Sequence, residues 1–169
     1  MAEHGDLLVI GYGNPGRGDD GLGPEFARRL AATAKPGIRV EIDYQLTVDH
    51  AQMVASAGRV LFVDAAMNLA APCTLRRLSP DPRAALDSHS LSPEAVLALA
   101  DILYGQCAEA SVLAIGGESF GEVHEGLSPV AHRNLVLAEE IFRAWLAGQS
   151  TRPMVADAAA TRAGARASR

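Results

Sequence analysis

Apolar residues along this chain occur in short continuous runs, separated by longer stretches in which they recur at helical spacing. The run over residues 7–10 is apolar without alternation, which is typical of a strand buried on both faces of a parallel sheet. Further strands are predicted over residues 38–42, 59–63, 74–78 and 111–115. Helices are predicted from Pro24 to near Lys35, over residues 48–57, from Ser92 to about Tyr104 and from Ser128 to about Leu146.

The order of these elements predicts the fold class. Strands that alternate with helices form a mostly parallel sheet covered on both faces, and two strands in succession suggest one antiparallel member. We therefore expect a single-domain α/β sandwich of three layers, with a twisted five-stranded sheet between helices, over residues 1–148. Residues 149–169 carry four arginines, one aspartate and few apolar groups, so a disordered Ala/Arg-rich tail is predicted there.

The loop after the first strand is rich in glycine and also carries two adjacent carboxylates. Six glycines lie between Gly11 and Gly23, around Asp19 and Asp20. The loop lacks the Gly-Lys-Ser/Thr ending that holds phosphate, and its carboxylates would repel an anion. They instead favour a metal ion or acid/base chemistry.

Three residues form the candidate site. Asp20 follows the first strand, Asp64 ends the third, and His89 lies in the loop before the third helix. Because the carboxyl ends of parallel strands open on one edge, two carboxylates and an imidazole could meet there as ligands of a first-row divalent metal.

Each of these residues also has a simpler interpretation. Asp19 or Asp20 could cap the helix behind the loop, Asp64 could bind loop amides, and His89 could be a surface histidine. His124 is a further candidate from the loop before the last helix.

Composition narrows the class of protein. A net charge of −5 argues against a nucleic-acid partner. The two cysteines form no CxxC pair, Cys73 has no evident base partner, and no Ser lies in a Gly-x-Ser-x-Gly elbow. The sequence shows no signal-peptide pattern and no apolar run of roughly 18 residues. We expect a cytoplasmic monomer with reduced thiols and no membrane association.

Four separated motifs resemble the hydrogenase maturation proteases, the endopeptidases that trim the large subunit of nickel–iron hydrogenases. The motifs are Gly11-Tyr12-Gly13-Asn14 with Asp19-Asp20-Gly21-Leu22-Gly23, then Val63-Asp64-Ala65, then His89 before a Leu/Ala-rich helix, and finally Gly126-Leu127-Ser128-Pro129. Their order and spacing cover about residues 6–147.

The resemblance implies an activity, a partner and a set of site residues. It implies an endopeptidase that removes the C-terminal extension of a nickel–iron hydrogenase large-subunit precursor after nickel insertion. Nickel would arrive in the precursor, held by cysteine thiolates, as a transient ligand. The family's nickel-contacting carboxylate, aspartate and histidine map onto Asp20, Asp64 and His89, which would also be the catalytic residues.

The chain departs from the family pattern in two places. Many relatives have Glu where this chain has Asp20, whose carboxylate lies one methylene closer to the backbone. Many also carry a Gly-Gly-Thr turn after the second strand, whereas residues 43–50 here keep only the Thr. That stretch is more similar to the branch that serves soluble, bidirectional hydrogenases.

Three other functions remain alternatives. Peptidyl-tRNA hydrolases share Gly13-Asn14-Pro15-Gly16, but they continue with an Arg-His-Asn stretch and need a basic face for tRNA. A dinucleotide- or metal-binding module would take its ribose-binding acid from Glu41 or Asp43. A relative that binds the nickel subunit without cutting it is the third.

Overall fold

Five strands form one sheet in a computed structural model that describes residues 6–84, 90–121 and 123–148. The strands are β1 (Leu7–Tyr12), β2 (Ile38–Asp43), β3 (Arg59–Ala66), β4 (Cys73–Leu78) and β5 (Glu109–Gly116). Their order is β2-β1-β3-β5-β4, and only β4 runs antiparallel to its neighbour. The predicted mostly parallel sheet with one antiparallel member is therefore confirmed.

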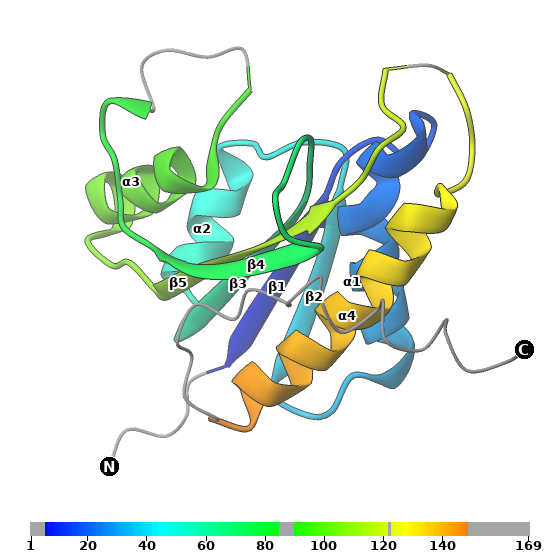
Figure 1. The fold of residues 1–169 in the computed structure, drawn as a ribbon. Helices are drawn as coiled ribbons and strands as arrows, with labels where there is room; N and C mark the ends of the chain where they lie inside the picture. The colour runs from blue at the N-terminus through cyan, green and yellow to red at the C-terminus, as the bar shows by residue number, and fades with distance from the viewer. Residues whose placement is uncertain (1–5, 85–89, 122, 149–169) are drawn as a thin grey trace, which may run out of the picture.

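Helices cover both faces of this sheet, as Figure 1 shows. One face carries α1 (Leu22–Thr33) and α4 (Pro129–Leu146), and the other carries α2 (Asp49–Ala55) and α3 (Pro93–Tyr104). Alternate residues of β1 divide between the two cores, with Leu7 and Val9 on the α1/α4 face and Leu8 and Ile10 on the α2/α3 face. The continuous apolar run of β1 follows from this burial on both faces.

The predicted helix start signals act as hydrogen-bonding caps. The Ser92 Oγ accepts from the Ala95 N–H at 3.2 Å, and the Ser128 Oγ accepts from the Ala131 N–H at 3.1 Å. Each serine precedes a proline in the first helical position, where a missing N–H costs nothing. In the part of the chain that the structure describes, no helix is both long and apolar enough to span a bilayer.

Each predicted strand is longer in the structure, and one predicted loop contains a short helix. β1 extends to Tyr12 and β3 extends to Ala66, so Asp64 lies inside β3 instead of at its end. β3 pairs with both β1 and β5, and the pairing with β5 continues to its last residue. A short 3₁₀ helix, η1 (Gly18–Gly21), forms where the glycine-rich sequence predicted only a loop. The predicted tail, residues 149–169, lies outside the described residues.

Glycines let α1 lie directly on the carboxyl ends of β1 and β3. A Cβ atom on Gly23 would lie 2.4 Å from the Tyr12 carbonyl oxygen and 2.5 Å from that of Val63. A Cβ atom on Gly11 would lie 2.3 Å from the carbonyl oxygen of Gly23. This close approach holds the loop that carries Asp19 and Asp20 against the edge of the sheet.

We predict that Gly13 is intolerant of substitution while Gly148 tolerates it. Gly13 has φ +140°, and a Cβ atom there would lie 2.0 Å from the Asp20 carbonyl oxygen. Gly148 has φ +71° with nothing within 4 Å. Gly13→Val should lower the free energy of unfolding by more than about 3 kcal/mol or prevent folding, whereas Gly148→Ala meets no clash and should cost only the roughly 1–2 kcal/mol of a left-handed backbone. Urea unfolding measures both, and equal losses would contradict the close-packed loop.

Candidate active site

Asp64 and Tyr12 are neighbours on adjacent strands. Asp64 has the same orientation in β3 as Val60 and Phe62, so it faces the α2/α3 side of the sheet. Gly11 of β1 pairs with Val63 of β3, and Tyr12 therefore lies beside Asp64. The Tyr12 hydroxyl donates a hydrogen bond to the Asp64 carboxylate.

The surroundings of Asp64 suit proton transfer near neutral pH. Burial and, to a smaller extent, the negative charge of Asp20 raise the pKa of this carboxyl from its ordinary value to about 6. Hydrogen bonds from the Tyr12 hydroxyl and the Ala65 N–H stabilise the ionised form and oppose that rise in pKa. A carboxyl group with a pKa near 6 can both accept and return a proton at physiological pH.

Asp20 stands in η1, directly above the end of β1. Its Oδ2 accepts a hydrogen bond of 2.8 Å from the Asn14 N–H, which closes the first part of the loop. Because β1 and β3 are parallel neighbours and Asp20 lies in the loop after β1, the two carboxylates lie at the same edge of the sheet. The structure thus brings these two predicted residues together, whereas their metal-binding and catalytic roles stay predictions.

The third predicted residue, His89, lies outside the described residues. The helix that follows it, α3, begins at Pro93 on the face of the sheet to which Asp64 points. The charge of Glu94, in the first turn of α3, raises the pKa of Tyr12, and its Oε1 lies 3.3 Å from the Arg76 Nη2. Within residues 6–84, 90–121 and 123–148, no three His, Cys, Asp or Glu side chains group closely enough to hold a metal ion.

Asp19 has a different role from its neighbour. Its side chain is fully buried and accepts hydrogen bonds from the N–H groups of Glu118, Ser119 and Ser128 and from the Ser128 hydroxyl, at 2.7–3.0 Å. Burial alone would raise the pKa of Asp19, but these four donors outweigh it and hold the pKa below the ordinary value. Asp19 therefore ties the first loop to the segment that starts α4.

The simpler interpretation of the acidic pair is corrected by these contacts. Neither η1 nor α1 has a side-chain cap, so neither Asp19 nor Asp20 caps the helix behind the loop. Asp19 instead binds Ser128, which itself caps α4. Sequence reasoning missed this role because the partners of Asp19 lie about a hundred residues away.

Two other candidates, His124 and Cys73, have very different surroundings. His124 joins the same two loops through its backbone, because its N–H donates to the Gly16 oxygen and its oxygen accepts from the Gly18 N–H, while the residue itself is exposed. Cys73 is buried, which raises the pKa of its thiol to about 11, so it stays protonated and is a poor nucleophile. Tyr12 was not predicted as a site residue, although a tyrosine that ends an apolar run is a recognisable signal.

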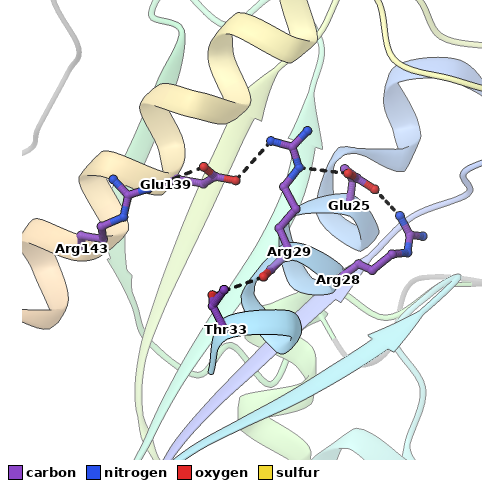
Figure 2. Close-up of polar contacts among 6 residues, drawn as sticks. All are labelled: Glu25, Arg28, Arg29, Thr33, Glu139 and Arg143. Atoms are coloured by element: carbon purple, nitrogen blue, oxygen red, sulfur yellow. Dashed lines mark hydrogen bonds and ion pairs between the residues drawn. The ribbon is translucent and has the colours of Figure 1, made fainter. Parts of the chain in front are cut away.

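A groove of about 830 Å³ lies elsewhere, between the C-terminal halves of α1 and α4. Figure 2 shows the ionic contacts beside it, in which Arg29 of α1 lies between Glu25 and Glu139. Its Nη1 lies 3.3 Å from the Glu139 Oε1 and links the two helices. The groove also includes Ile38, the first residue of β2, so it lies toward the opposite edge of the sheet from Asp20 and Asp64.

We predict that Asp19 contributes far more to stability than its neighbour Asp20. Asp19→Asn places an amide among four donors and removes a buried charge, and it should lower the free energy of unfolding by about 2–4 kcal/mol. Asp20→Asn keeps an oxygen for the Asn14 N–H and should change stability by less than about 1 kcal/mol. Chemical denaturation of both variants measures the difference, and an equal effect of the two substitutions would refute the assignment.

We predict that Asp64→Asn stabilises the fold in a pH-dependent way. The folded-state pKa near 6 exceeds the ordinary value of 3.8, so the folded state binds a proton more tightly than the unfolded state. The wild-type chain therefore loses stability as pH rises from about 4 to 6. Asp64→Asn removes this loss and should gain about 2 kcal/mol at pH 8, with little gain at pH 4. Thermal melts at both pH values test this; a gain that does not grow with pH would exclude the raised pKa.

Solved structures of hydrogenase maturation proteases share this fold. No protein-family model and no curated protein matches the chain. The [NiFe] hydrogenase maturation protease HycI from Thermococcus kodakarensis is 23% identical with a TM-score of 0.63, covering 82% of this chain and 92% of its own. The hydrogenase maturating endopeptidase HybD from E. coli is 22% identical with a TM-score of 0.62, covering 88% and 97%. A hydrogenase 2 maturation peptidase from a Thaumarchaeota archaeon is 20% identical with a TM-score of 0.59, covering 85% and 99%. The chain thus has the fold expected from the resemblance, that of the hydrogenase maturation proteases.

Proposed function

We propose that this chain is an endopeptidase that removes the C-terminal extension of a nickel–iron hydrogenase large-subunit precursor after nickel insertion. The observation that carries the proposal is the pair of carboxylates, Asp20 and Asp64, at the carboxyl edge of a sheet with the fold of these proteases. In parallel α/β sheets this edge is where ligands and catalytic groups gather.

Nickel enters this proposal as part of the substrate. Asp20, Asp64 and His89 are two oxygen donors and one nitrogen donor without a thiolate, a set that leaves coordination positions open. Cysteine thiolates of the precursor, which already hold the nickel ion, would occupy these remaining positions, so that the ion joins the precursor to this chain. Helix α3 begins on the face of the sheet to which Asp64 points, four residues after His89. This position supports His89 as the third ligand.

Peptide hydrolysis needs a water molecule made nucleophilic beside the scissile bond. The Asp64 carboxylate can take a proton from that water as its oxygen attacks the carbonyl carbon. The same proton then passes to the amide nitrogen as the carbon–nitrogen bond breaks, which leaves a new carboxylic acid and a new amine. The substrate's nickel is the other group that can activate the water, as a Lewis acid. Tyr12 would hold the Asp64 carboxylate in position through its hydroxyl.

We propose that the turn after β2 determines which hydrogenase precursor is the partner. Residues 43–50 replace the Gly-Gly-Thr turn of many relatives, and they leave β2 at the same edge of the sheet as Asp20. A change at this place would alter which precursor fits, and it would leave the two carboxylates and their chemistry unchanged. The soluble, bidirectional class of hydrogenase is the partner that this turn favours.

We predict that both Asp64→Asn and His89→Ala abolish processing of the nickel-loaded precursor. The first removes a charge at nearly constant shape, and the second removes the nitrogen donor. The gel mobility of the large subunit, in cells that carry each variant, reports whether the extension has been removed. Purified wild-type protein should cut the nickel-loaded precursor and leave the nickel-free precursor intact.

Matched substitutions separate loss of function from loss of folding. Asp101→Asn on α3 and His132→Ala on α4 change the same residue types at exposed positions and should leave processing unchanged. Asp64→Asn should also be more stable than the wild type at pH 8, so its inactivity would not reflect unfolding. Full maturation with either site variant, or normal cleavage of nickel-free precursor, would refute the proposal. Binding without cleavage by the wild type would assign the chain to the non-cutting class.

A further inference from the structure

Exposed apolar side chains gather at the edge of the sheet that carries Asp20 and Asp64. Tyr44 is 71% exposed, Met67 is 65% exposed and Val123 is 95% exposed. Tyr44 directly follows β2, Met67 directly follows β3, and Val123 lies between β5 and α4. Single exposed apolar residues are ordinary on a protein surface, whereas several at one functional edge indicate an interaction site.

The strand order places these side chains on both sides of the candidate site. In the order β2-β1-β3-β5, the residues that follow β2 and β5 flank those of β1 and β3, to which Asp20 and Asp64 belong. Three strand spacings make this edge about 14 Å wide. We call Tyr44, Met67 and Val123 the edge apolar set.

The same edge is strongly acidic. In the described residues of the loops that follow β1, β2, β3 and β5, Arg17 is the only lysine or arginine. Five partly or fully exposed acids occur in these loops or in the strand ends beside them: Asp20, Asp43, Asp64, Glu118 and Glu125. A complementary surface would therefore combine apolar side chains with basic ones.

We propose that this edge is the surface on which the precursor docks, through a folded region that presents apolar side chains together with lysine and arginine side chains next to its metal. This inference rests on the proposed function and adds the surface and the chemistry of the partner. The edge apolar set projects from loops that leave the sheet on both sides of the carboxylates, which suits the face of a protein. A second copy of this chain would bring two acidic edges together, so like charges disfavour it.

The docking surface is tested by binding in a chain that cannot cut. Full-length Asp64→Asn serves as the background, and purified nickel-loaded large-subunit precursor is the probe. Adding Tyr44→Ser and Met67→Gln should weaken binding at least about tenfold, because a few large apolar side chains supply much of the binding energy of an interface. Binding should also weaken as salt rises, since the proposed partner carries opposite charge.

The matched control changes apolar residues at the other end of the molecule. Ile102 and Leu103 are 65% and 54% exposed on the last turn of α3, which leads into the start of β5. Ile102→Gln with Leu103→Ser should leave affinity within about twofold of the background. Equal loss of affinity in the control pair and the edge pair would overturn the assignment of the edge.

Kinetics with the active-site residues intact separate this inference from the proposed function. Tyr44→Ser with Met67→Gln should raise KM with kcat unchanged, because the contact is made equally before and during the reaction. Cleavage with unchanged KM would overturn the docking surface and leave the proposed function standing. Failure of the wild-type chain to cut any nickel-loaded precursor would instead remove the proposed function.

Two other occupants of the edge have distinct outcomes. If the edge variants turn a wild-type dimer into a monomer in sedimentation velocity, the occupant is a second copy and the proposal is wrong. If the edge variants lose their effect in a chain ending at Gly148, the occupant is the chain's own arginine-containing residues 149–169, which also overturns the proposal. Unchanged effects of the variants in that shorter chain would support the precursor as occupant.

Discussion

The buried carboxylate of Asp19 is the interaction on which the geometry of the site depends. It accepts four hydrogen bonds from the segment between β5 and α4, and it lies in the loop that follows β1. Without it, three backbone N–H groups and one hydroxyl in this corner would lose their acceptor, a costly state inside a protein. Because Asp20 is the next residue, the same contacts that close the corner also place the neighbouring carboxylate at the edge of the sheet.

Two carboxylates in this corner, those of Asp19 and Asp64, are made different by their surroundings. Donors surround Asp19 and lower its pKa, whereas burial and a neighbouring negative charge raise the pKa of Asp64. Carboxyl groups whose pKa values are pushed apart in one site commonly divide structural and proton-transfer roles. The division here is between a residue that organises two loops and one that remains able to exchange a proton near neutral pH.

The two ends of the sheet have different surfaces. At the carboxyl edge, apolar side chains and carboxylates face outward together. Toward the amino edge, the groove between α1 and α4 is bordered by Arg29 and Glu139, which are already paired with each other. Exposed ion pairs of this kind contribute little to stability, but they leave fewer free charges to attract a partner. The carboxyl edge therefore presents exposed apolar side chains together with acidic ones, the combination on which the proposed docking surface rests.

The sequence by itself determined the order of elements, the parallel sheet with one antiparallel strand, the serine caps of α3 and α4, and Asp20 and Asp64 as residues of one edge. These features depend on hydrophobic period, local capping and the direction of parallel strands, which neighbouring residues specify. Only the tertiary structure decided that Asp19 binds residues beyond position 117, that β3 continues past Asp64, and that Tyr12 hydrogen-bonds Asp64. The raised pKa of Asp64 belongs to the same group, because desolvation arises from distant segments that pack together. Local sequence does not encode which donors, charges or apolar groups those segments bring to a side chain.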